Sequence, residues 1–82
     1  METRIAIIAI VVEKPNHIEQ LNQILHTYSE YIIGRMGIPY AKRGISLISV
    51  AIDAPADIIS SISGKIGMLE GISAKTVYSK LP

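Results

Sequence analysis

Two segments of strand length constrain the fold of this chain most strongly, IAIIAIVV at Ile5–Val12 and ISLISVAI at Ile45–Ile52. Both are rich in Ile and Val, whose branched side chains favour extended backbone. Successive side chains of a strand point to opposite faces, and both segments have apolar residues at odd and even positions alike. No register therefore leaves either segment with a polar face, so we expect two central strands that are covered on both faces.

An amphipathic helix is predicted after each of these strands. Asn16, with Glu19 three residues later, forms a capping-box pattern for the first helix. Pro55 suits the first turn of the second helix, which ends at Gly71. The apolar stripe of the first helix is Ile18, Leu21, Ile24, Leu25 and Tyr28, and that of the second is Ile58, Ile59, Ile62, Ile66 and Leu69.

Two further strands complete the pattern. Tyr31–Met36 predicts a short strand, after which Gly37–Pro39 leads into a turn over Tyr40–Gly44, and Pro39 places this region at a sheet edge or in the connection. Ile72–Ser79 predicts a last, more polar strand. The order is then βαββαβ, the split βαβ arrangement of ferredoxin-like folds. We therefore expect an α+β fold with a four-stranded antiparallel sheet and two helices on one face. With 82 residues, the chain is expected to form one domain over residues 1–82.

The second face of this sheet needs a cover of its own, because both helices lie on the first face. Burial of a few hundred Å² of apolar surface at about 25 cal/mol per Å² is worth several kcal/mol. The most common cover is another copy of the same chain, so we expect a homo-oligomer, either a dimer or a tetramer. The residues predicted for this interface are Ile8, Ile10, Ile48, Val50 and Ile52.

Charge and composition exclude several classes of function. The net charge is +1, and the eight basic residues are spread along the chain, which argues against direct binding of nucleic acid. The absence of Cys excludes disulfides, thiolate nucleophiles and cysteine-ligated metal centres. The longest apolar run, Ile5–Val12, is too short to span a membrane and lacks the features of a signal peptide, so a cytoplasmic location is expected.

The second helix also carries a stripe of small residues. Ser60, Gly64 and Gly67 lie nearly opposite the apolar stripe at about 100° per residue. An interior glycine costs about 0.5–1 kcal/mol relative to Ala, which suggests that a backbone or a ligand approaches the helix there. The alternative is that the helix ends near Ile66 and that Gly67 is its left-handed cap.

Arg35 is the strongest polar candidate. Strict alternation places Tyr31, Ile33 and Arg35 on one face of their strand and the intervening residues on the other. The guanidinium could bind a carboxylate of a neighbouring subunit or an anionic effector. The alternative is a solvent-facing residue of an edge strand, where charge protects against aggregation.

Other motifs give weaker signals. His17 and His26 are nine residues apart, too far for two ligands of one metal on the same helix. The Ser63–Lys65 segment lacks the spacing of a phosphate-binding loop, so its lysine is expected to be solvated. Asp53 and Asp57 suit the positive end of the second helix better than an acid–base pair. No nucleophile with its base is visible, and we expect no catalytic residue, no metal site and no cofactor.

Several segments resemble the small regulators of the iron-only hydrogenase system. The match is carried by YIIGRMGIP at residues 31–39, by the strand ISLISVAI, by SGKIG at 63–67 and by LEGISAKTVYSK at 69–80. More distantly, the chain is similar to ACT regulatory domains and to the ligand-sensing domain of nickel-responsive repressors, which share this topology and assemble through their sheets. The resemblance implies an ACT-like domain with a regulatory role.

Two departures from these relatives narrow what the resemblance implies. ACT domains that bind amino acids commonly have Gly after Pro in the loop that follows the first strand, whereas here Asn16 follows Pro15. Nickel-responsive repressors bind their metal with several His and a Cys, and this chain has two His and no Cys. An amino-acid effector and nickel sensing by that route are therefore disfavoured.

We expect a non-catalytic regulatory or sensing module of the hydrogenase system that acts as a homo-oligomer, with a small-molecule effector site between subunits. An adaptor that docks on a hydrogenase or a maturation enzyme is the alternative, and a small metal- or anion-handling enzyme is a third hypothesis. Neither nucleic acid nor membrane is expected as a partner. The residues predicted for the effector site are Glu13, Asn16, Arg35, Gly64, Lys65 and Gly67.

Overall fold

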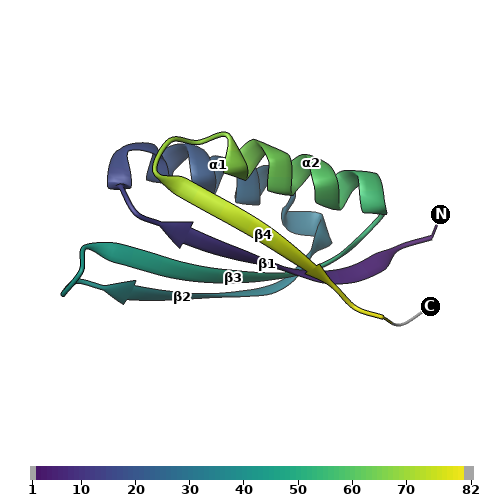
Figure 1. Cartoon of the computed structure of the whole chain (residues 1–82). Helices are drawn as coiled ribbons and strands as arrows, with labels where there is room; N and C mark the ends of the chain where they lie inside the picture. Colours follow the sequence, from purple (N-terminus) through teal and green to yellow (C-terminus); the bar gives the residue numbers. More distant parts are fainter. Residues whose placement is uncertain (1, 81–82) are drawn as a thin grey trace.

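The structure of the protein is a computed structural model that describes residues 2–80. It consists of one antiparallel sheet with two helices packed on the same face (Figure 1). The elements follow the predicted order βαββαβ, with two short 3₁₀ turns, η1 and η2, on either side of the first helix. The strand order is β2-β3-β1-β4. The bounds are β1 Arg4–Val12, η1 Pro15–His17, α1 Ile18–Thr27, η2 Ser29–Tyr31, β2 Ile32–Tyr40, β3 Ile45–Ala54, α2 Ala56–Gly67 and β4 Ile72–Tyr78.

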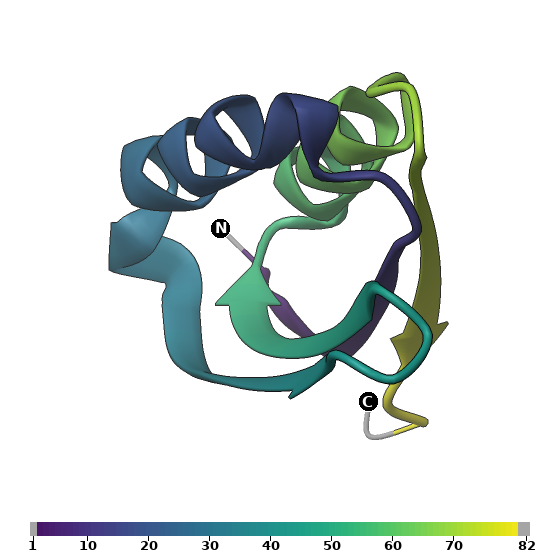
Figure 2. The same ribbon diagram turned by 90° about the vertical axis from the view of Figure 1, so that its left-hand side faces the viewer.

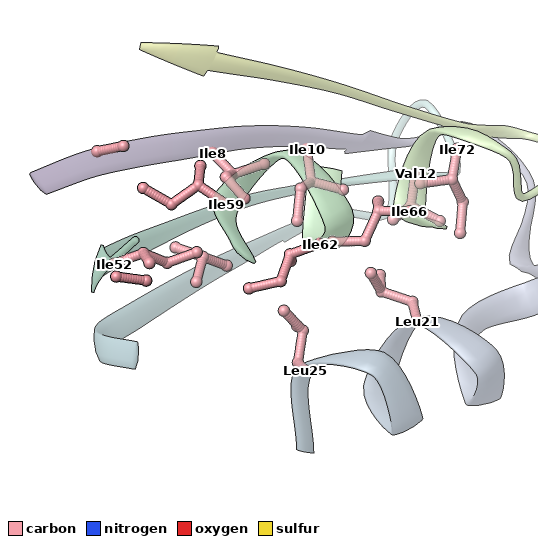
Figure 3. Packing of buried hydrophobic residues seen from close by; sticks show 13 residues of the cluster. Ile8, Ile10, Val12, Leu21, Leu25, Ile52, Ile59, Ile62, Ile66 and Ile72 are labelled. Carbon is pink, nitrogen blue, oxygen red and sulfur yellow. The ribbon is translucent and has the colours of Figure 1, made fainter. Parts of the chain in front are cut away.

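The core fills the space between the sheet and the helices, which form two layers when the molecule is viewed end-on (Figure 2). Leu21 and Leu25 of α1 point toward Ile62 of α2 and the central strands (Figure 3). The strands contribute their even-numbered residues, and the buried set is Ala6, Ile8, Ile10, Val12, Leu21, Leu25, Val50, Ile52, Ala54, Ile59, Ile62, Ile66 and Ile72. No charged or polar residue between 2 and 80 belongs to this buried set.

The residues predicted for the subunit interface lie on the wrong face of the sheet. Ile8, Ile10, Val50 and Ile52 are at most 1% exposed under the helices, and Ile48 is half-buried against the same core. The odd-numbered residues of β1 and β3 point away from the helices instead. Both the odd- and the even-numbered residues of the central strands are apolar. The sequence pattern therefore indicated two covered faces, but not which of them the helices cover.

The second strand is longer than predicted. It runs through Gly37–Pro39 and ends at Tyr40, and the turn lies at Ala41–Gly44, within the predicted range. Pro39 is opposite Ser46 in the ladder between β2 and β3. A proline can occupy this strand because β2 is at the edge of the sheet, where its missing N–H has no second neighbour to bond.

An irregularity near the start of β2 changes which residues share a face. The ladder shifts register between Ile32, opposite Ile52, and Gly34, opposite Ala51. After the shift, Arg35 is opposite Val50, so Arg35 and Ile32 both lie on the helix side of the sheet. The predicted grouping of Arg35 with Ile33 is therefore wrong, since one extra residue reverses the alternation.

The helix ends also differ from the prediction. Asn16 lies inside η1, so α1 begins at Ile18 without a side-chain cap, and the predicted capping box does not form. The second helix extends through Gly67, and Met68 after it has a right-handed conformation. Gly67 is therefore not a left-handed cap. Left-handed glycines in the described chain are Gly44 and Gly71, which lie in turns.

Candidate functional site

The sheet surface that faces away from the helices carries large apolar side chains on all four strands, together with Ser49, Asp53, Ser73 and Lys75. We call it the open face, and its large side chains are Ile5, Ile7, Val11, Met36, Ile38, Tyr40, Leu47 and Val77. Ile7 is 47% exposed, Leu47 43% and Val77 63%, so the large residues of the central strands and of the edge strand β4 alike remain accessible to solvent. Within residues 2–80, the sheet is thus covered on one side only.

The centre of the open face is lower than its surroundings. Ala9, Ser49 and Ala51 lie there on adjacent strands, and their short side chains leave room between the larger ones. One hollow of about 170 Å³ is lined partly by Met36, Ile38 and Leu47. A second hollow of about 180 Å³ lies beside Ile5, Ile7 and Val77. The surface is therefore ridged rather than flat.

A polar groove lies on the helix side of the sheet, between α1, η2 and β2. Arg35 enters it because of the register shift in β2 and donates from Nη2 to Oδ1 of Asn22 at 3.5 Å. The groove has a volume of about 470 Å³ and is open to solvent. Its lining residues are Asn22, Leu25, His26, Ser29, Ile32 and Arg35.

Glu13 lies at a tight backbone junction at the far end of β1. The N–H groups of Glu13 and Lys14 both donate to the carbonyl of Gly71, at 2.7 and 3.2 Å. Gly71 has a φ of 80°, and a Cβ at this position would lie 2.6 Å from Cβ of Lys14. The connection after β1 is thus fixed against the turn before β4, and the side chains of Glu13 and Asn16 are exposed beside it.

The outer surface of α2 holds the remaining candidates. Gly64 and Gly67 are exposed, and a Cβ at either position would meet no atom within 4 Å apart from the backbone of its own helix. Lys65 was predicted to be solvated. It is exposed, but its Nζ donates to Oη of Tyr28 at 2.7 Å. The same Nζ is 5.0 Å from the centre of the Tyr28 ring, so Lys65 connects the two helices.

The six residues predicted for an effector site lie in three places within one chain. Arg35 is on the edge strand β2, which β3 separates from β1, and its contact is with α1. Glu13 and Asn16 follow the far end of β1, while Lys65 reaches Tyr28 on the outside of the helices. A single site built from all six would need residues of a second subunit, and it stays a prediction.

The groove contains three polar residues that sequence reasoning did not select as binding residues, namely Asn22, His26 and Ser29. Asn22 and His26 are four residues apart on the polar side of α1, and this spacing in the sequence indicates that they share a helix face. Their proximity to Arg35 depends on the register shift in β2, which the sequence pattern did not reveal.

Chemical groups for catalysis are sparse in the described chain. Among residues 2–80, no group of three or more His, Cys, Asp and Glu lies close enough together to hold a metal ion. His26 lines the groove, while His17 lies at the opposite end of α1 with an unpaired Nδ1. Oδ1 of Asp57 accepts from the N–H of Ile58 at 3.0 Å, so this carboxylate stabilises the start of α2.

No described helix has the length and apolar character needed to cross a membrane.

The fold and its surfaces define a class of protein, an ACT-like domain of the ferredoxin-like type with one uncovered sheet face. Residues 4–76 match the family described as "TM1266-like: Iron-only hydrogenase system regulator, putative", and the chain belongs to this family. The resemblance noted for the segments from YIIGRMGIP to LEGISAKTVYSK is thereby confirmed.

One solved structure supports this family assignment, and a second shares the fold. The uncharacterized protein TM1266 from Thermotoga maritima is 35% identical, with a TM-score of 0.92 over 96% of this chain and 100% of that one. A formyltetrahydrofolate deformylase from Pseudomonas putida KT2440 is 11% identical, with a TM-score of 0.64 over 89% of this chain and 28% of that one. The second likeness concerns the fold alone. No curated protein matched the chain.

Proposed function

We propose that this protein is a non-catalytic regulatory module of the iron-only hydrogenase system, which acts in the cytoplasm as a homo-oligomer and responds to a small effector. The observation that carries the proposal is the open face. A fold of this kind buries one side of its sheet under helices, and here the other side exposes large apolar residues that include Ile7, Leu47 and Val77. A second copy of the chain is its proposed cover.

The size of the open face suits a second copy. Its strands have seven to ten residues. At ~3.3 Å per residue and ~4.8 Å between strands, four of them cover roughly 500 Å² in plan. The accessible area of a ridged surface exceeds its plan area, so the face approaches the ~800 Å² per partner of a standard interface. An exposed apolar patch of a few hundred Å² often marks an interaction surface.

The shape of the open face supports the same partner. In a two-fold dimer each subunit presents the same surface, so large side chains of one copy must fit hollows of the other. The low centre at Ala9, Ser49 and Ala51 offers such space next to Ile7 and Leu47. Packed sheets lie ~10 Å apart with interdigitated side chains, an arrangement that this alternation of small and large residues favours.

The family to which the chain belongs supports a regulatory role, and we propose that this role involves no catalysis. We propose that the effector binds to Arg35, either on the helix side of the sheet or between subunits. In a site between subunits, a neighbouring copy would supply the other predicted residues, which are Glu13, Asn16, Gly64, Lys65 and Gly67. A regulator needs a surface that binds selectively, and the Arg35 groove presents the polar side chains of Asn22, His26, Ser29 and Arg35.

Sedimentation equilibrium of the purified protein over a range of concentrations tests the assembly. A mass that stays at two or four chains on dilution is the expected result. A monomer at all concentrations would refute self-association, and the open face would then be assigned to docking on a hydrogenase or a maturation enzyme. Co-purification of such a partner in fixed ratio would establish that adaptor role.

A gene-deletion experiment tests the regulatory role. In a cell that carries the iron-only hydrogenase system, loss of the gene should change the amount of active hydrogenase, and the wild-type gene should restore it. Unchanged hydrogenase levels under all growth conditions that induce the system would contradict the proposed function.

A further inference from the structure

We propose that the Arg35 groove binds short-chain monocarboxylates. The inference deepens the proposed sensing function and rests on it, because it names the chemical class of the effector. The groove lies on the helix side of the sheet, opposite the open face, so binding in the groove and association through the open face can be tested separately. Its volume of about 470 Å³ falls within the range of ~300–1,000 Å³ for small-molecule sites.

The charge of the groove favours an anion. Arg35 supplies one permanent positive charge, and none of the other lining residues carries a carboxylate. Since a guanidinium stays protonated in proteins, this charge is present at every physiological pH. A single cation balances a monocarboxylate, whereas a phosphate group with nearly two negative charges would leave charge unneutralised.

The guanidinium of Arg35 keeps most of its donors available. It has five N–H groups in a planar fork, and its contact with Oδ1 of Asn22 is 3.5 Å, which is long for a hydrogen bond. The Arg35 side chain is also exposed at the edge strand. Two parallel N–H groups can therefore bind the two oxygens of a carboxylate, the geometry in which Arg binds most selectively.

An apolar floor lies beside this charge. Leu25 is 2% exposed and belongs to the core, and half-buried Ile32 packs against it from the start of β2. The amide of Asn22 and the hydroxyl of Ser29 line the same groove and are additional donors. A ligand that matches this surface has one carboxylate and a short alkyl chain.

An NMR titration of the isotope-labelled full chain tests the proposal with acetate, hexanoate, hexanamide and inorganic phosphate as probes. Hexanoate should give saturable shifts at the amides of Asn22, Ser29 and Arg35. Its affinity should exceed that of acetate by up to about fourfold for each methylene that leaves water. Hexanamide, which has the same chain without charge, should bind at least about tenfold more weakly.

Two arginine variants separate a specific site from general attraction of anions. Arg35→Gln should weaken hexanoate at least about tenfold, and Arg35→Lys, which keeps the charge but loses the fork, should recover only part of the affinity. Arg43→Gln removes the same charge in the exposed turn between β2 and β3 and should leave binding unchanged. The amide spectrum of each variant verifies that it remains folded.

Three results would overturn the proposal: no saturable binding of hexanoate, equal binding by Arg35→Gln, or tighter binding of inorganic phosphate than of hexanoate. The mass of the same samples is measured in parallel. A stable oligomer without hexanoate binding would refute the carboxylate site alone, while a monomer that binds hexanoate would refute only the association through the open face.

Discussion

Single residues determine how the ends of the elements meet. Gly71 has a left-handed conformation, and its carbonyl accepts from the N–H groups of Glu13 and Lys14, which fixes the connection after β1. Lys65 binds Tyr28 across the outside of the two helices. The sequence indicated that Gly71 ends a helix, but its contact with Lys14 joins residues far apart in the chain, which local pattern does not reveal.

Gly71→Ala should lower the free energy of unfolding by about 2 kcal/mol or more. Part of the loss is the strain of a side chain in the left-handed region, and part is the overlap of the new Cβ with Lys14. Gly44→Ala is the control, because Gly44 has a similar φ of 66° and open space around its Cβ position. Urea unfolding of both variants measures the difference, and equal losses would show that the Lys14 contact costs nothing.

Gly64→Ala should raise the free energy of unfolding by about 0.5–1 kcal/mol. Alanine is the better helix former, and its Cβ meets no atom outside the backbone of its own helix. Thermal unfolding and the solution mass are measured together. A stabilised variant of unchanged mass is expected, whereas a loss of stability or of mass would show that a second subunit or a ligand approaches α2 at this residue.

At the scale of elements, the sequence predicted all four strands and both helices, because apolar periodicity is strong in each. The errors lie at boundaries. The second strand was predicted to end at Met36, yet it continues through Gly37 and Pro39, which an edge strand tolerates. The register shift in β2 depends on pairing with β3 and is what moves Arg35 to the helix side. Arg35 was predicted as a binding residue, but the groove that it enters could not be predicted from the sequence.

The helix layer depends on residues that no solvent reaches. Ile62 of α2 is fully buried and points between the sheet and α1 (Figure 3). Ile62→Ala should cost about 2–5 kcal/mol, because the transfer energy is lost and a cavity remains. Ile58→Ala on the same helix should cost less, since Ile58 is half-buried. Denaturant unfolding monitored by circular dichroism compares them, and a larger loss for Ile58→Ala would contradict the assigned core.

At the scale of the whole molecule, the apolar strands predicted a sheet with two covered faces. The helices cover the face with Ile8 and Val50, and the face with Ile7 and Leu47 remains open. Composition alone could not assign these faces, because exchanging them leaves the pattern of apolar residues nearly unchanged. The three-dimensional register makes the assignment, and it moves the proposed interface from the even-numbered to the odd-numbered residues of the central strands.

The mass of a Leu47→Lys variant in solution tests this interface most directly. Leu47 is 43% exposed, so the lysine can reach water in a single subunit, but in a sheet-to-sheet assembly it would be a charge buried without a partner. Met68→Lys is the control, because Met68 is 87% exposed beyond the end of α2, away from the sheet. By sedimentation equilibrium we expect an oligomer for the wild type and for Met68→Lys, and a folded monomer for Leu47→Lys. An oligomer of undiminished stability in Leu47→Lys would contradict association through the open face.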